Sequence, residues 1–398
     1  MRIGIFTDQY YPLISGVVTS IKMLYEGLES LGHQCFIFAS FDEKLAEGCD
    51  ELKNKNIINF EGKPYPFKAI KDYRYTIRHK KFVSIIKEYK LDIIHVHTEY
   101  NISKIAIKAS KQLGIPIVHT LHTSWKDYIK YLFPRLDKVF HRPFLWLEKK
   151  IFTEPISKAS TIEIVPTKKV LHDLKIYGMK DNVKVIPTGI DLSRFDESNF
   201  TKEEKEKLKK ELNINDEFVF SFIGRTSKEK NIEIVIEAFS KAFNSEDKVK
   251  LLIVGGGPEL DELKELARTL NISNKLVFTD LIPYDKVPIY YQIADVFVNA
   301  SESETQGLTY IEALSSSVPV LVKKDECIFD IVEEGFNGFY FNNIDELINK
   351  MKSIYQNKDE LKVIKNNTTN SVKKYSKRQY SKNILAVYKE AISIYKNK

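Results

Sequence analysis

The 398-residue chain has no run of 18 apolar residues, so its sequence predicts no membrane-spanning helix. Cysteine is scarce as well: Cys35, Cys49 and Cys327 are far apart and odd in number. They fit neither a disulfide framework nor a metal-binding spacing, which favours a reducing compartment. The N-terminal stretch "MRIGIFTDQYYP" lacks the apolar core of a signal peptide, so we expect none.

Metal-binding patterns are also missing. No Asp-x-Asp pair occurs, and no histidine follows His172. The histidines of "IIHVHTEY" and "HTLHTSW" lie near predicted strand ends, where four imidazoles are a conceivable zinc site, but no further ligands accompany them. We therefore expect no metal and no cofactor. In each pair we expect the earlier histidine, His95 or His119, to be satisfied within its strand, which makes His122 the functional candidate.

The charge is positive and unevenly distributed. The formal net charge is +7, residues 1–195 carry 31 Lys and Arg against 21 Asp and Glu, and residues 358–398 carry 11 against 3. A basic N-terminal half and a basic tail thus flank a more acidic middle. This asymmetry suggests an anionic surface as partner, either a membrane or a nucleic acid.

Strand and helix patterns alternate along the whole chain, whose length suggests two domains. The first series of apolar runs is "RIGIF", "QCFIFAS", "LDIIHVH", "IPIVHTLH" and "TIEIVPT". The second, after "VKVIPTGIDLSRFD", is "FVFSFIGR", "KLLIVGGGP", "KLVFTD", "ADVFVNA" and "VPVLVK". The pattern predicts an α/β protein of two doubly wound parallel sheets, with a ligand held at the carboxyl ends of the strands.

Two loops have features that suit a phosphate. Gly16, in "SGVVTSIK", precedes a predicted helix, whose first N–H groups attract anions; an ordinary loop with a serine cap is the alternative. In "GRTSKEKN", Arg225 and Lys230 follow a strand and could hold a diphosphate leaving group, unless they are solvated surface charges, as Lys228 is expected to be. The stretch "VGGGPELDEL" fails as a dinucleotide fingerprint because Leu260 occupies the third glycine position, so we interpret it as a turn.

Two acids flank a predicted strand-to-helix turn in "SESETQGLTYIEALSSSVPV". Glu304 is in the loop and Glu312 is on the helix. On one helix they would lie roughly 12 Å apart, beyond the roughly 5 to 9.5 Å of glycosidase carboxylate pairs. We expect them to hold separate parts of one long ligand, the alternative being one surface acid and one helix acid.

Two segments mix cations with apolar and aromatic residues: residues 63–90 and 125–152. A basic face beside an apolar face is typical of helices that bind anionic lipid, although the same pattern also suits a helix that covers its own sheet. The residues predicted to contact a membrane are Lys63, Lys68, Lys71, Arg74, Arg78, Lys80, Lys81, Trp125, Lys130, Phe133 and Arg135.

The ordered set of motifs resembles the retaining glycosyltransferases of family 4. The matching stretches are "SGVVTS", "HTLHTSW", "VIPTGIDLSRF", "GRTSKEKN", "LLIVGGGPELDELKELA", "KLVFTDLIP" and "SESETQGLTYIEALSSSVPVL". Within the family, "LISGVVTSIKMLYEGLESLGH" and "HVHTEYNISKIAI" are most similar to the bacterial members that glucosylate diacylglycerol. Thr305 and Gln306 stand where many members have Gly-Phe or Ser-Phe, so the sugar contacts differ there.

The resemblance implies a GT-B fold, with two Rossmann-like domains facing across a cleft. Residues 1–196 would bind acceptor and membrane, residues 197–375 the nucleotide sugar, and residues 376–398 would form a helix crossing back to the first domain. Glu304, Arg225, Lys230 and His122 are the implied catalytic residues. The implied donor-binding residues are Gly16, Val17, Arg225, Lys230, Leu281, Ile282, Glu304, Gly307, Leu308, Thr309 and Glu312.

The activity implied by the resemblance is transfer of glucose from UDP-glucose to the 3-hydroxyl of 1,2-diacylglycerol, with retention and without metal, on the cytoplasmic face of the membrane. The expected partners are a UDP-sugar, diacylglycerol and an anionic phospholipid surface. A soluble acceptor is the alternative within the same fold. A nucleic-acid binder is the alternative outside it, but the aromatic residues are interleaved with aliphatic ones and no nucleic-acid-binding module is recognisable.

Overall fold

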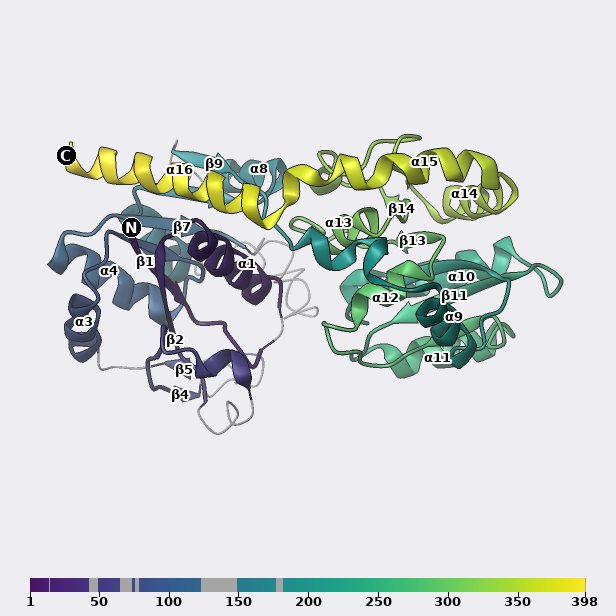
Figure 1. Ribbon diagram of the computed structural model, residues 1–398, viewed down its shortest axis with the longest axis horizontal. Coiled ribbons are helices and arrows are strands. Elements are labelled where there is room, and N and C mark those ends of the chain that lie inside the picture. Colours follow the sequence, from purple (N-terminus) through teal and green to yellow (C-terminus); the bar gives the residue numbers. More distant parts are fainter. Residues whose placement is uncertain are drawn as a thin grey trace. The chain divides into compact units, whose positions relative to one another are not determined.

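The computed structural model describes residues 1–13, 15–42, 49–64, 74–75, 79–122, 149–176 and 182–397 (Figure 1). The chain forms two compact units, residues 1–190 with 377–398 and residues 191–376. The sequence placed the first boundary after residue 196, six residues later than the structure does. The short 3-10 turn Leu192–Phe195 belongs to the second unit because its carbonyls accept hydrogen bonds there, from Ser315 to Leu192 and from Gln292 to Phe195.

The first unit is built on a seven-stranded parallel sheet. Its strand order is β3-β2-β1-β6-β7-β8-β9. The strands are β1 (Arg2–Thr7), β2 (Gln34–Ala39), β3 (Ile57–Asn59), β6 (Ile93–Val96), β7 (Ile117–Thr120), β8 (Ile162–Val165) and β9 (Val183–Val185). The strand order reverses between β1 and β6, which is where ligands bind in sheets of this kind. A separate antiparallel pair joins β4 (Lys63–Pro64) and β5 (Arg74–Tyr75).

Helices cover both faces of this sheet. They are α1 (Gly16–Ser30), α3 (His79–Glu88), α4 (Asn101–Leu113), α7 (Glu154–Ala159), α8 (Lys168–Ile176) and α16 (Lys377–Lys396). Alternate residues of β1 and β2 face opposite ways: Ile3, Ile5 and Ile37 pack with α1 and α16, whereas Phe6 and Phe38 pack with α3 and α4. Both faces are therefore apolar, as expected for strands buried on two sides.

The C-terminal helix α16 returns to the first unit, as the resemblance implied. It lies beside α1, and both contribute to one core cluster (Figure 1). Polar contacts fix its position: Tyr380 and Ser20 are linked through their hydroxyls at 3.1 Å, and Lys377 pairs with Glu26 at 2.8 Å. The two helices are in close contact at Gly27 of α1, where an added Cβ would lie 2.0 Å from Oγ of Ser381.

The second unit contains a six-stranded parallel sheet of order β12-β11-β10-β13-β14-β15. Its strands are β10 (Phe218–Ile223), β11 (Val249–Val254), β12 (Leu276–Phe278), β13 (Val296–Asn299), β14 (Val320–Lys323) and β15 (Gly338–Phe341). Its helices are α9 (Lys202–Glu211), α10 (Ile232–Ala242), α11 (Leu260–Thr269), α12 (Val287–Gln292), α13 (Leu308–Ser315), α14 (Ile344–Gln356) and α15 (Lys358–Ser371). Here the order reverses between β10 and β13.

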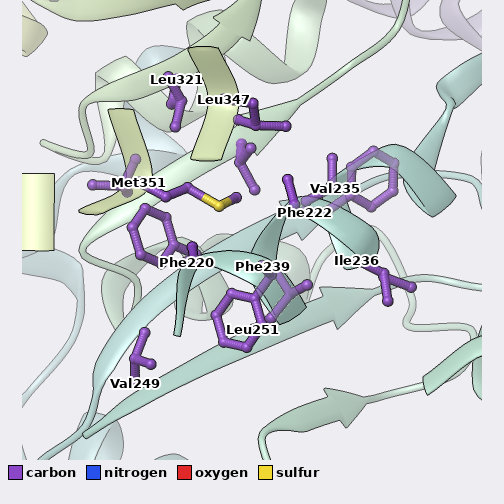
Figure 2. Packing of buried hydrophobic residues seen from close by; sticks show 14 of the residues in the cluster. Phe220, Phe222, Val235, Ile236, Phe239, Val249, Leu251, Leu321, Leu347 and Met351 are labelled. Carbon is purple, nitrogen blue, oxygen red and sulfur yellow. The ribbon is translucent and has the colours of Figure 1, made fainter. Parts of the chain in front are cut away.

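The main core of this unit lies between the sheet and helices α10 and α14. Figure 2 shows Phe220 and Phe222 of β10 among side chains from both helices, including Phe239 and Met351. All of these side chains are essentially inaccessible to solvent. This core holds β10 rigidly, and with it the loop that follows at the strand's carboxyl end.

Among the described residues, no helix combines the length and apolar character needed to cross a bilayer.

The close approach at Gly27 yields a stability prediction. In an open helix position, Gly→Ala would stabilise by up to about 1 kcal/mol. Here we expect Gly27→Ala to destabilise the protein by about 1–3 kcal/mol because the new methyl group collides with Ser381. Urea unfolding measures the difference.

The matched control is the double variant with Ser381→Ala. Oγ of Ser381 is buried and has no hydrogen-bond partner in the part of the chain that the structure describes, so its removal alone should cost little. Combined with Gly27→Ala, it should restore part of the lost stability, a coupling that a double-mutant cycle detects. A Gly27→Ala protein more stable than the wild type would contradict the packing of α16 on α1.

Candidate active site

The second unit brings Lys230 and Glu304 together at the point where its strand order reverses. Lys230 follows β10 and Glu304 follows β13, the two neighbouring strands on either side of the reversal. The Nζ of Lys230 lies 2.5 Å from Oε1 of Glu304, and both side chains are about four-fifths buried, with 22% and 15% exposed. Both residues are among those predicted from the sequence, whereas their contact with each other was not predicted.

The loop that carries Lys230 is attached to the end of β13 by hydrogen bonds. Asn231, in the left-handed region at φ 50°, donates from its amide to the carbonyl of Ala300 at 3.1 Å. The hydroxyl of Ser301 donates to the carbonyl of Glu229 at 3.2 Å. Because Glu229 and Asn231 flank Lys230 in the chain, these contacts tie the turn that carries the cation to the end of β13.

The two cations predicted to hold the diphosphate, Lys230 and Arg225, differ in their surroundings. Burial acts to lower the pKa of Lys230, but the adjacent Glu304 carboxylate outweighs it and raises that pKa above its usual value. Lys230 is therefore a fixed positive charge at neutral pH. Arg225, five residues earlier, is exposed, and Lys228 is exposed as predicted. This turn thus offers one largely buried, ion-paired cation and one exposed cation.

The three glycines of "VGGGP" support the Arg225 loop. A Cβ on Gly255 would lie 2.1 Å from the carbonyl oxygen of Gly224, and one on Gly257 would lie 2.2 Å from that of Thr226. The two loops are joined by a hydrogen bond of 3.1 Å from the N–H of Thr226 to the carbonyl of Gly256. The glycines allow backbone to pack on backbone, consistent with a turn rather than a dinucleotide fingerprint.

The loop after β13 leads into α13, whose N-cap residue, Gly307, has no side chain with which to cap the helix. Gly307 precedes the helix at φ 75°, and a Cβ there would collide with the ring of Tyr310. Leu308 and Thr309, partly exposed, open the helix, and helix geometry leaves their N–H groups without intrahelical partners. Such a terminus is suited to an anion. Of the other predicted donor-binding residues in this unit, Leu281 is exposed and Ile282 is half-buried.

Glu312, in the second turn of α13, is buried and held by tyrosines. Its two carboxylate oxygens accept hydrogen bonds from the hydroxyls of Tyr284 and Tyr291, each at 3.0 Å. The guanidinium of Arg194 lies 4.5 Å from the Tyr284 ring and donates to its carbonyl. Burial raises the pKa of Glu312 to about 7, although the tyrosines and Arg194 counteract the rise. The sequence analysis named Glu312 but missed its partners, which lie 21 and 28 residues earlier in the chain.

In the first unit, α1 begins at Gly16 immediately after the predicted loop. Ser15 caps this helix by accepting a hydrogen bond from the N–H of Val18. Gly16 is exposed, and a Cβ there would meet no described atom within 4 Å. Since internal packing does not require glycine at this position, the open space favours the predicted approach of a ligand. Val17 is half-buried.

The histidines gather at the ends of β6 and β7. His95 is satisfied as predicted, because its two ring nitrogens contact the hydroxyls of Tyr388 and Thr120, each at 2.7 Å. His119 is likewise held, by Glu163 at 3.1 Å and Glu99 at 3.4 Å. No group of three potential metal ligands occurs among the described residues.

His122, the functional candidate, is half-buried and lies 2.9 Å from His97. Burial and the nearby His119 lower the pKa of His122 to about 3, so its imidazole is neutral at physiological pH. A neutral imidazole can offer a ligand either a donor or an acceptor, depending on its tautomer.

The residues predicted to contact a membrane divide into three groups. Lys63 on β4 and Lys80 and Lys81 on α3 are exposed. The prediction that Arg74 contacts a membrane is wrong. Its guanidinium is largely buried, pairs with Asp42 and donates to a carbonyl, so it is not a free surface cation. The residues that lie outside the described ranges are Lys68, Lys71, Arg78, Trp125, Lys130, Phe133 and Arg135.

The apolar face of α3 is also not available to lipid. Phe82, Val83 and Ile86 are buried in the core of the first unit. For this helix, the alternative that it covers its own sheet is therefore correct, and only its lysine face is directed to solvent.

Two family models match the chain. Residues 14–194 match the model described as Glycosyltransferase Family 4, and residues 204–371 match the model described as Glycosyl transferases group 1. Each match falls on one half of the chain.

Two relatives are similar to this chain over most of its length. The chain is 38% identical to an alpha-monoglucosyldiacylglycerol synthase of Acholeplasma laidlawii over 98% of both chains. It is 37% identical to an enzyme of the same name from Streptococcus pneumoniae, over 87% of this chain and 76% of the relative.

Among solved structures, HepE of Anabaena in complex with UDP is similar in fold, with a TM-score of 0.75 at 18% identity over 98% of this chain and 100% of the other. The fold is GT-B, with two Rossmann-like parallel-sheet units, which confirms the predicted fold class. With a relative 38% identical over nearly its whole length and family models on both halves, the chain belongs to glycosyltransferase family 4.

Proposed function

We propose that the protein transfers glucose from UDP-glucose to the 3-hydroxyl of 1,2-diacylglycerol, with retention of the α configuration, at the cytoplasmic surface of a membrane. The observation that carries the proposal is the contact of Lys230 with Glu304 at the strand-order reversal of the second unit. The acceptor is proposed from the two relatives, both named alpha-monoglucosyldiacylglycerol synthase.

The chemistry of the donor requires positive charge at this place. As the bond from the anomeric carbon to the β-phosphate oxygen breaks, both electrons remain on the diphosphate, and its negative charge increases. Lys230, Arg225 and the N-terminus of α13 are the groups proposed to stabilise that charge. Because Lys230 and the N-terminus of α13 are held in place before the reaction, little reorganisation of these two groups is needed in the transition state. Glu304, next to Lys230, is proposed to accept hydrogen bonds from the sugar hydroxyls, and Glu312 from the ribose.

Retention is proposed to follow from attack on the same face as the leaving group. The acceptor oxygen forms a bond to the anomeric carbon while the diphosphate departs, and the acceptor's proton passes to a phosphate oxygen. Lys230 remains protonated throughout, in keeping with its raised pKa. We propose that the protein's own cations take the place of a metal ion.

The acceptor is insoluble, so the enzyme must work at a lipid surface. Lys63, Lys80 and Lys81 are exposed on the first unit and carry charge suited to anionic lipid. The apolar face of α3 is buried and does not contribute. We therefore propose peripheral binding through surface charge rather than through insertion of this helix.

The direct test offers radiolabelled UDP-glucose together with diacylglycerol in mixed micelles. We expect a monoglucosyl lipid of α configuration, formed faster with anionic than with zwitterionic phospholipid and unaffected by chelators. Transfer to soluble sugars or polyols with none to diacylglycerol would refute the acceptor. Loss of activity with chelators and recovery with manganese would refute the role of the protein cations.

Removal of the held cation should affect turnover most. We expect Lys230→Ala to lower kcat by about 100-fold or more, since one preorganised electrostatic group contributes on that scale. Lys228→Ala, in the same turn but with its side chain 67% exposed, is the matched control and should leave kcat unchanged. Thermal unfolding shows whether Lys230→Ala remains folded. A folded Lys230→Ala enzyme with near-normal turnover would exclude Lys230 from the site.

The pKa of Glu312 predicts how donor binding depends on pH. In the free protein this pKa is about 7. Ribose hydroxyls donate to the carboxylate form, so binding should lower the pKa and release a proton. The Kd for UDP-glucose should thus be constant above pH 7 and rise by up to about tenfold per unit below it. UDP-glucose itself does not titrate in this range. Calorimetry measures the Kd for UDP-glucose at several pH values for the wild type and for Glu312→Gln. The variant should bind more weakly, with a Kd that is independent of pH. A wild-type Kd that is also independent of pH would contradict the role of Glu312.

A further inference from the structure

His97 and His122 form a hydrogen-bonded pair of imidazoles at the carboxyl edge of the first sheet. Nδ1 of His97 lies 2.9 Å from Nε2 of His122. The rings are within 19° of parallel and their centroids are 5.2 Å apart. The two nitrogens are much closer than the centroids, so the rings meet edge to edge, the arrangement in which an N–H of one ring can be directed at the lone pair of the other.

His97 is held rigidly from behind. The ring of His95 packs against it with centroids 4.1 Å apart, and His95 is itself fixed by the hydroxyls of Tyr388 from α16 and Thr120 from β7. His97 is only 1% exposed. Its orientation is thus determined by the core, whereas half-buried His122 stands between that core and solvent.

The other ring nitrogen of His97, Nε2, indicates which tautomer this ring adopts. Nε2 is buried and has no hydrogen-bond partner among the described residues. A buried N–H without an acceptor is rarer in proteins than an acceptor without a donor. This favours the tautomer in which Nε2 carries only a lone pair and the proton is on Nδ1.

The charge nearby bears on whether the histidines of this cluster are protonated. His119 lies between the carboxylates of Glu163 and Glu99. Although burial acts to lower it, the hydrogen bond to Glu163 and the nearby carboxylate of Glu99 raise the pKa of His119 to about 9, so it is an imidazolium at neutral pH. Burial, and the charge of this cation among smaller causes, lower the pKa of His97 and so favour its neutral form, which has one N–H and one lone pair. His95, His97 and His122 all have pKa values lowered first by burial, so they are neutral.

We propose that His97 is a positioning residue that donates its Nδ1 proton to Nε2 of His122 and thereby fixes His122 as the tautomer protonated on Nδ1. His122 then presents an N–H donor, rather than a lone pair, at its other ring nitrogen. Its ligand is an oxygen acceptor, either a hydroxyl of the transferred sugar or a phosphate oxygen of the donor. This last step rests on the proposed function; the tautomer does not.

The tautomer can be measured directly without substrate. In protein labelled with ¹⁵N-histidine, the His122 signals are assigned by comparison with His122→Asn. We expect a protonated, pyrrole-type Nδ1 and an unprotonated, pyridine-type Nε2 in the wild type. A proton on Nε2 of wild-type His122 would overturn the proposal.

Two variants of nearly equal shape separate donation from packing. The amide of His97→Asn can place an N–H near the former Nδ1, so we expect it to keep the His122 tautomer and most of kcat. The carboxylate of His97→Asp only accepts, so it should move the His122 proton to Nε2 and lower kcat by about 10- to 100-fold, as lost supporting contacts do elsewhere. The KM for UDP-glucose should change far less than kcat. Equal kcat values for the two folded variants would contradict the proposal.

His97→Leu covers the case in which His97→Asp does not fold. Leucine removes the unpartnered nitrogen, so thermal stability should be maintained or raised. Because His122 then has no donor, its tautomers should mix and kcat should fall. A stable His97→Leu enzyme with wild-type kcat overturns the proposal.

Failure of the proposed function gives a different result. A wild type that glucosylates no diacylglycerol refutes the function, yet the ¹⁵N spectra still decide the tautomer. A wild type that is active but carries the proton on Nε2 of His122 refutes only the role of His97.

Discussion

The contact between Lys230 and Glu304 depends on the strand order of the second sheet. Only because β10 and β13 are neighbours do residues 74 positions apart in the chain meet at 2.5 Å. The Glu304 carboxylate keeps Lys230 charged although its side chain is largely buried. An unpaired ammonium would be energetically unfavourable there. Because we propose that the same carboxylate also accepts hydrogen bonds from the donor sugar, this one contact would serve both the stability of the cation and the proposed donor site.

The surrounding structure can be understood as support for that contact. The aromatic core around Phe220 and Phe239 fixes β10, and the glycines of the β11 loop allow the Arg225 turn to pack backbone on backbone. On the other side, α13 brings an open N-terminus and a buried Glu312 held by tyrosines. The first unit follows the same plan, with an exposed Gly16 at a helix start and a histidine cluster braced by the C-terminal helix.

The elements that the sequence predicted well have strong local signals. Apolar runs of β-branched and aromatic residues located the central strands, and the loop position of Glu304 and the helical position of Glu312 followed from the turn between them. The strands β3, β9 and β15 were missed; each lies at an edge of its sheet, where only one neighbouring strand pairs with it and a long apolar run is not required. Contacts between distant segments could not be predicted: the Tyr284 and Tyr291 hydroxyls on Glu312, the Asp42 partner of Arg74 and the donor for His122 all depend on tertiary packing.

The central claim is that protein cations, rather than a metal, receive the departing diphosphate at the Lys230–Glu304 contact. A crystal structure of the complex with UDP tests it most directly. We expect β-phosphate oxygens within about 3.2 Å of Nζ of Lys230. Arg225 should be turned towards them, and the first N–H groups of α13 should be directed at the same phosphate. A diphosphate bound away from these groups, or coordinated by a metal ion in their place, would contradict it.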